Sequence, residues 1–188
     1  MDHAPFDFTE TSHSDLVSGR SPWGGEARRP QSQPFDDSFK VDVAIVGGGI
    51  TGALTAQVLT AMGLSVCVID RERPGLGSTS ASTAMLEWEI DAPLGELAGY
   101  YGFERAAAIY RRSHAAVSGL ATLMASLRVD CAFRPRPTLY IAGEEQAPDS
   151  LIEEMLLRER AGLPGRFLPA AELAERFSIS RAGAIHSP

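Results

Sequence analysis

The sequence predicts an α/β protein that begins with a strand–helix–strand unit on a parallel sheet. Three observations support this prediction. A β-branched apolar run, Val41–Val46, is followed at once by three glycines. A stretch of small, helix-compatible residues then runs from Ile50 to about Met62, and a second apolar run, Ser65–Asp70, ends in an acid. Apolar runs of this kind are typical of strands buried on both faces of a parallel sheet.

The glycines after the first strand have the G-x-G-x-x-G spacing at Gly47, Gly49 and Gly52. In this pattern the first glycine allows a tight turn out of the strand. The second lets a pyrophosphate approach the backbone, and the third lets the helix lie close to the sheet. The helix that begins with Ile50 and Thr51 offers unpaired N–H groups and about half a positive charge to a diphosphate.

Asp70 ends the second strand, at about the 20-residue interval expected for an acid that accepts hydrogen bonds from an adenosine ribose and disfavours a 2′-phosphate. Such a turn can serve either NAD or FAD, and a glycine-rich turn without a ligand is the alternative. We favour dinucleotide binding because the strand, the glycines, the helix and the acid coincide.

Composition excludes several other classes of protein. The 188 residues suffice for one ordinary domain, or for a domain and part of another. A net charge of −7 argues against a nucleic-acid surface. We see neither an apolar run long enough to span a membrane nor a signal peptide, and therefore expect a cytoplasmic location. Cys67 and Cys131 are expected to be reduced packing residues in buried strands, and the histidines have no metal-ligand spacing.

The stretch after Asp70 is rich in small residues. A turn containing Pro74 and Gly75 leads into Ser78–Ala84, seven small residues of which five carry hydroxyls. This stretch is either a second cofactor-contact loop that leads into a short helix, from Ser82 to about Trp88, or a solvated linker. Its position directly after the second strand favours the contact loop.

The remaining elements follow from periodicity and caps. Residues 1–39 are polar and proline-containing, which predicts a poorly ordered arm. Asp91 and a Ser150–Glu153 capping box are expected to begin two helices, and the tail after Ser178 shows no clear element. The helices expected downstream cover residues 93–100, 104–127, 150–161 and 170–177, and the expected strands cover residues 131–134 and 138–142.

A doubly wound sheet needs further parallel strands, and this sequence turns instead to helices and to a strand pair of different character. We therefore expect the dinucleotide domain to be begun but not completed in these residues. A nicotinamide-dependent dehydrogenase would be expected to show another regular β-α-β repeat after Asp70, which makes it the less favoured alternative.

The segments VDVAIVGGGITGALTA, VCVIDRE and GLGSTSASTAMLEWEID resemble the D-amino-acid oxidase family of FAD-dependent oxidoreductases, which includes glycine oxidase-like and sarcosine oxidase-like proteins. The segments CAFRPRPTLYIA, AGLPGRFLPAAELAERF and AGAIHSP resemble the start of that family's substrate domain. The resemblance implies an incomplete FAD-binding region of the Rossmann type over residues 40–128. It also implies the incomplete start of an α+β substrate domain over residues 129–188, as in the truncated N-terminal half of a family member.

The resemblance also implies FAD as the cofactor and a small amine or amino acid as the substrate, oxidised at its C–N bond by hydride transfer to flavin N5. Asp70 would bind the adenosine ribose, with Arg71 beside the adenine. Thr83-Ala84-Met85 stands where many members have a small Ala-Gly pair. The residues implied at the pyrophosphate and on the approach to the flavin are Gly47, Gly49, Ile50, Thr51, Gly52, Gly77, Ser78, Thr79, Ser80 and Thr83. The sequence identifies no catalytic residue, no metal ligand and no oligomeric state.

A second hypothesis is a truncated product that binds FAD weakly or has no activity. We expect the purified chain neither to hold stoichiometric FAD nor to oxidise amines.

Overall fold

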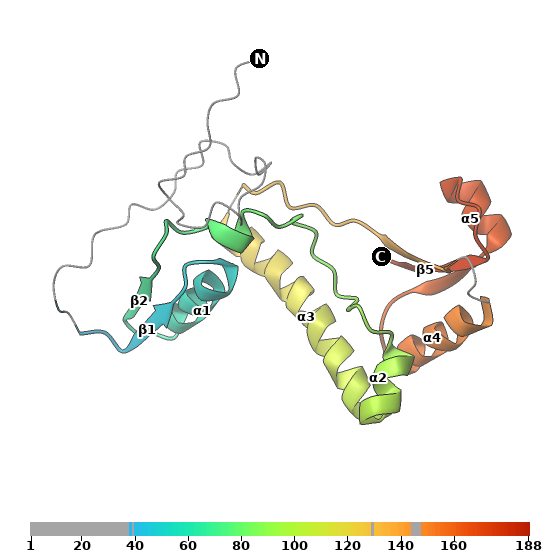
Figure 1. Cartoon of the computed structure of the whole chain (residues 1–188), viewed down its shortest axis with the longest axis horizontal. Helices are drawn as coiled ribbons and strands as arrows, with labels where there is room; N and C mark the ends of the chain where they lie inside the picture. The colour runs from blue at the N-terminus through green and yellow to red at the C-terminus, as the bar shows by residue number, and fades with distance from the viewer. Residues whose placement is uncertain (1–37, 39, 129, 144–147) are drawn as a thin grey trace, which may run out of the picture. The chain divides into compact units, whose positions relative to one another are not determined.

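The computed structural model describes residues 38, 40–128, 130–143 and 148–188, so the predicted N-terminal arm lies almost wholly outside the described residues. The chain divides into two compact units, Met1–Met85 and Leu86–Pro188 (Figure 1). The functional domains predicted over residues 40–128 and 129–188 stay a prediction.

The first unit confirms the predicted strand–helix–strand start. Strand β1 (Val43–Val46) is followed by helix α1 (Ile50–Ala61) and strand β2 (Val66–Ile69). The two strands pair in parallel, with Val43 opposite Val66 and Val46 opposite Ile69, and α1 forms the crossover between them (Figure 1). Parallel neighbours need such a crossover because a tight hairpin cannot join them.

A side-chain clamp fixes the register where both strands begin. The Asp42 Oδ2 atom accepts hydrogen bonds from the Ser65 amide at 2.8 Å and from the Ser65 hydroxyl at 2.6 Å. These bonds hold the pKa of Asp42 below its ordinary value, the side-chain bond having the larger effect. The carboxylate therefore remains charged and joins the two strand ends.

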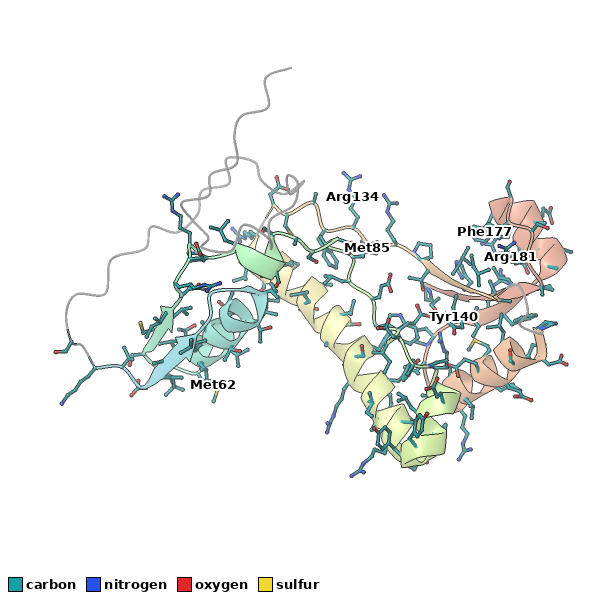
Figure 2. The ribbon with its side chains drawn as sticks, in the orientation of Figure 1. Met62, Met85, Arg134, Tyr140, Phe177 and Arg181 are labelled. Atoms are coloured by element: carbon teal, nitrogen blue, oxygen red, sulfur yellow. The ribbon has the colours of Figure 1, made fainter. Side chains whose placement is uncertain are left out.

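The prediction that both strands are buried on both faces is wrong for the described part of this unit. Across residues 40–85, all of which the structure describes, no hydrophobic side chain is fully buried. Val46 is 88% exposed, and Met62, just beyond the end of α1, is 71% exposed. Figure 2 labels Met62 beside α1. The strands are apolar enough for burial, but two strands and one helix cannot cover both faces of the sheet.

The helix predicted from Ser82 to Trp88 does not form. The chain instead makes one short 3-10 helix, η2 (Gly77–Thr79), and residues 81–87 are exposed and irregular. The Ser82 hydroxyl accepts a hydrogen bond from the Ala84 amide at 3.1 Å, and Ala84 has a φ of 57°. Such local side-chain bonds compete with helical hydrogen bonds.

The described residues of the second unit form four helices and a three-stranded antiparallel sheet. Its strands lie in the order β3-β5-β4, with Ile185 opposite both Tyr140 and Phe167. In Figure 1, α2 packs beside the long α3. The fully buried apolar side chains include Leu94, Leu151 and Leu173. The elements are α2 (Leu94–Tyr101), α3 (Phe103–Leu127), β3 (Thr138–Ile141), α4 (Pro148–Arg160), β4 (Arg166–Pro169), α5 (Ala170–Phe177) and β5 (Gly183–Ser187).

The structure corrects the strand predictions in this unit. Residues 131–137 are exposed and form no strand, so Cys131 is an exposed free thiol rather than a buried packing residue. Pro135 and Pro137 remove ladder donors from this segment. Strand β5, in the tail that was expected to have no element, is the central strand of the sheet. Strand β4 was not predicted from the sequence either.

Two predicted caps are wrong as well. Pro93, rather than Asp91, occupies the N-cap position of α2, without a side-chain cap bond of its own. Helix α4 begins at Pro148, so Ser150 lies inside the helix and does not cap it. Among the described residues, no helix combines the length and the apolar character that crossing a membrane requires.

Candidate functional site

The glycine turn after β1 has the backbone that its spacing predicts. Gly47 has a φ of +109°, which side-chain-bearing residues rarely adopt, and its amide donates to the Ile69 carbonyl at 2.8 Å. The turn therefore starts directly from the strand pair. A Cβ atom on Gly52 would lie 1.9 Å from the Gly47 carbonyl oxygen. Helix α1 can pack this closely against the turn only because Gly52 has no side chain.

Gly48 and Gly49 face other parts of the same unit. The Gly48 amide donates to Asp70 Oδ2 at 2.5 Å, and its carbonyl accepts from the Gly75 amide at 3.2 Å. A Cβ atom on Gly49 would lie 3.1 Å from the Thr79 hydroxyl oxygen. The turn is thus held between the end of β2 and the following loop. The predicted approach of a pyrophosphate to Gly49 stays a prediction.

The N-terminus of α1 presents amides that the described protein leaves unpaired. Its N-cap, Gly49, offers no side-chain bond, and the first turn contains no acidic residue. The Ile50 amide donates to the Thr79 hydroxyl at 3.2 Å. Within the described part of the chain, the next two amides, those of Thr51 and Gly52, have no acceptor. Free amides at the positive end of a helix favour an anion such as a phosphate.

Asp70 lies at the end of β2, beside this turn. Its Oδ1 atom accepts from the Glu72 amide at 2.9 Å, while Oδ2 accepts from Gly48. These two backbone bonds, first that of Glu72 and then that of Gly48, hold the pKa of Asp70 below its ordinary value. The side chain is therefore an oriented carboxylate, and each oxygen retains a lone pair that can accept a ribose hydroxyl.

The predicted contact loop is brought to the turn through one side chain, that of Thr79. The Ser80 hydroxyl instead donates to the Gly77 carbonyl at 2.8 Å, within the same loop. Arg71, Ser78 and Thr83 are exposed. The cofactor contacts expected of all these residues stay predictions. Sequence reasoning did not identify Gly48 or Gly75, although the third consecutive glycine and the Pro74-Gly75 turn were visible signals.

The arrangement fits an adenosine diphosphate. The turn combines helix-terminal amides that have no acceptor in the described part of the chain with an oriented carboxylate, and its glycines place no side chain beside them. The amides suit a diphosphate, whereas the carboxylate suits sugar hydroxyls.

The second unit contains a buried charge network that sequence reasoning missed. Arg158 is 1% exposed; its Nη1 atom lies 2.6 Å from Glu89 Oε1 and its Nε atom 2.8 Å from Glu154 Oε1. Burial alone would lower the pKa of Arg158, but its hydrogen bond to Glu154 and the two carboxylate charges raise it. The guanidinium carbon also lies 5.5 to 5.7 Å from the ring centres of Trp88, Tyr110 and Tyr140.

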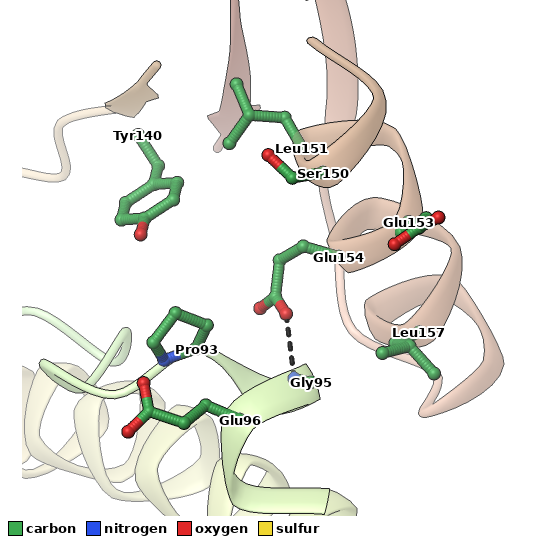
Figure 3. A pocket seen from close by; sticks show the side chains of 9 residues that line it. All are labelled: Pro93, Gly95, Glu96, Tyr140, Ser150, Leu151, Glu153, Glu154 and Leu157. Atoms are coloured by element: carbon green, nitrogen blue, oxygen red, sulfur yellow. Dashed lines mark hydrogen bonds between the residues drawn. The ribbon is translucent and has the colours of Figure 1, made fainter. Parts of the chain in front are cut away.

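Both carboxylates of this network have further donors. Glu89 accepts from the hydroxyls of Thr138 at 2.6 Å and Ser187 at 2.9 Å. Glu154 accepts from the amides of Leu94 and Gly95, each at 2.9 Å, and thereby caps α2. Figure 3 shows the bond to Gly95. The network thus joins α2, α4 and the sheet. Apart from the i, i+4 spacing of Glu154 and Arg158, nothing in the sequence signals it.

A pocket of about 250 Å³ lies beside this network, between α2 and α4 (Figure 3). Glu154 lines it, but its carboxylate is already held by backbone amides. Burial raises the pKa of the neighbouring Tyr110 to about 12, and its hydroxyl donates to the Ala92 carbonyl at 2.8 Å. We therefore assign these groups to the packing of the second unit.

Comparison with known proteins identifies the family. A family model described as FAD dependent oxidoreductase (DAO) matches residues 42–188. The chain belongs to the FAD-dependent oxidoreductase family. This result confirms the expected fold class and the expected cofactor of the family, and it makes a nicotinamide-dependent dehydrogenase the wrong alternative.

Two curated relatives match part of the chain. The putative Rieske 2Fe-2S iron-sulfur protein YhfW of Bacillus subtilis is 28% identical over 123 residues, which are 65% of this chain and 24% of that protein. Gamma-glutamylputrescine oxidoreductase of Escherichia coli is 26% identical over 132 residues, which are 69% of this chain and 31% of that protein. The chain therefore spans less than a third of either relative.

Two solved structures show the same fold over most of the chain. Glycine oxidase from Geobacillus kaustophilus matches with a TM-score of 0.57 and 26% identity, covering 79% of this chain and 39% of that protein. Glycine oxidase from Bacillus cereus matches with a TM-score of 0.54 over the same shares of the two chains. Its identity is 24%, so this second match supports the fold alone.

Proposed function

We propose that this chain carries the adenosine-diphosphate half of the FAD site of an oxidoreductase that acts on the C–N bonds of amines or amino acids. The observation that carries the proposal is the glycine turn. There the amides of Thr51 and Gly52, at the N-terminus of α1, have no acceptor among the described residues, and the Gly48 amide bonds the oriented carboxylate of Asp70 to the same turn.

Each group has a distinct role in this proposal. The amides of Thr51 and Gly52 bind the diphosphate, and the Asp70 carboxylate accepts hydrogen bonds from the adenosine ribose. A carboxylate at this position repels a 2′-phosphate, which favours FAD over NADP. FAD, when bound, supplies the acceptor for a hydride from the carbon next to the substrate nitrogen.

The substrate class rests on the names of the relatives. The curated relative from Escherichia coli is named for an amine substrate, and the glycine oxidase from Geobacillus kaustophilus is named for an amino acid. The chain spans 31% and 39% of these proteins, so amine or amino-acid oxidation is proposed for the whole protein.

We expect the chain itself to bind FAD weakly. No hydrophobic side chain in residues 40–85 is buried, so little packing energy holds the turn in its binding geometry. This observation favours the hypothesis of a weak FAD binder for the 188-residue chain. The predicted domain boundaries and the cytoplasmic location belong to the same proposal, and cell fractionation would test the latter.

The proposal is tested by titrating FAD with the purified chain and following flavin fluorescence. Asp70→Asn should raise the Kd for FAD about tenfold, because a hydrogen bond to a charged group is lost. Asp149→Asn is the matched control, since Asp149 is an exposed carboxylate in the first turn of α4 and lies outside the first unit. Failure of the unaltered chain to bind FAD, or an equal Kd for Asp70→Asn, would contradict the proposal.

A further inference from the structure

Helix α1 takes its cap from a residue far along the chain. Its own N-cap residue, Gly49, has no side chain to bond the first amides. The Thr79 hydroxyl, 29 positions beyond Ile50, accepts the Ile50 amide at 3.2 Å instead. An acceptor oxygen at a helix N-terminus satisfies an amide that would otherwise be unpaired.

The loop that carries Thr79 is shaped for this contact. Gly75 and Gly77 have φ values of +82° and +72°, so the chain bends sharply on either side of Leu76. The Gly75 amide donates to the Gly48 carbonyl at 3.2 Å, which anchors the loop to the turn at a second point. Thr79 itself closes η2, so its backbone is part of a regular turn.

Gly49 leaves the space that the hydroxyl needs. A Cβ atom there would lie only 3.1 Å from Thr79 Oγ1, which is tighter than most contacts of real Cβ atoms. The absence of a side chain at Gly49 therefore makes room for the Thr79 hydroxyl, and a larger residue at position 49 would displace that hydroxyl.

We propose that Thr79 is a positioning residue of the dinucleotide site, which acts through the Ile50 amide. By holding that amide, the hydroxyl leaves Thr51 and Gly52 as the amides that bind a phosphate, and so fixes the register of the diphosphate on α1. The proposal rests on the proposed function, because it concerns the same site.

The test uses the uniformly 15N-labelled chain and three variants. Thr79→Val removes the hydroxyl with little change in shape, and Thr79→Ser restores it. Thr122→Val makes the same substitution at an exposed threonine on α3, outside the first unit, and serves as the matched control. Exchange of the Ile50 amide is measured without ligand, and ADP is then added as the probe while amide shifts are followed.

In the unaltered chain, Thr79→Ser and Thr122→Val, ADP should shift the Thr51 and Gly52 amides and leave Ile50 almost unchanged. In Thr79→Val, Ile50 should exchange about five to ten times faster, because its acceptor is lost, and ADP should shift it as well. The Leu59 amide, near the end of α1, reports whether the helix still forms.

Equal exchange of Ile50 in Thr79→Val and the unaltered chain would overturn the proposal. The proposal would also be overturned if ADP shifted the Ile50 amide as strongly in the unaltered chain as in Thr79→Val. If ADP shifts no amide of the turn in any variant, the proposed function fails. The exchange of Ile50 without ligand then still decides whether Thr79 caps the helix.

Discussion

Arg158→Met should strongly destabilise the second unit. The guanidinium is 1% exposed and is the shared partner of Glu89 and Glu154. Removal of one partner from a buried ion pair costs about 3–5 kcal/mol, because the remaining charge stays desolvated and uncompensated. Here two carboxylates lose a partner, but each keeps two other donors. We therefore expect a loss near the lower end of that range, about 3 kcal/mol.

The assay is urea unfolding of the full chain, followed by far-UV circular dichroism, with Arg112→Met as the control. Arg112 is an exposed arginine on α3, so its substitution should change the free energy of unfolding by no more than about 0.5 kcal/mol. A loss below about 1 kcal/mol for Arg158→Met would refute the reasoning, because that amount is typical of an ordinary substitution. In that case the network would not be desolvated in solution.

Two further predictions concern smaller features. Gly52→Ala should weaken FAD binding at least tenfold in a fluorescence titration. The new Cβ would lie 1.9 Å from the Gly47 carbonyl oxygen, so the helix must move. An unchanged Kd would show that close packing of α1 on the turn is not needed for binding. Glu172 should titrate with a pKa of about 2 instead of 4.5, because its hydrogen bonds to Arg166 and then to Arg176 favour the carboxylate. The contribution of Glu172 to the free energy of unfolding should be present above pH 4.5 and should be lost as the pH falls towards 2. NMR titration of the Glu172 carboxyl carbon measures the pKa directly. In Arg166→Gln this pKa should rise, because the hydrogen bond with the larger effect is removed.

The strand–helix–strand start was predictable because its signals are local. The β-branched runs, the glycine spacing and Asp70 all lie within one stretch of sequence, and each demands a particular backbone. The long helix α3 was likewise predicted almost to its ends, since its apolar residues repeat at the helical period. Local patterns of this kind do not depend on what packs against them.

The elements that were missed depend on distant partners. Strand β5 is rich in small residues and becomes a strand because β3 and β4 pair with it on either side. Thr79 meets Ile50 across 29 positions, and Glu89 meets Arg158 across 69, so neither contact is visible as a spacing. The resemblance predicted cofactor-binding roles for whole residues. The structure adds which of their atoms contact the turn, such as the Asp70 carboxylate and the Thr79 hydroxyl.

The most direct test of the central claim is a competition experiment with the purified chain. FAD bound to the chain should be displaced by ADP, because the proposed site binds the adenosine-diphosphate part of the cofactor. FMN, which lacks that part, should neither bind measurably nor displace FAD. Displacement of FAD by FMN but not by ADP would contradict the assignment of the glycine turn and Asp70.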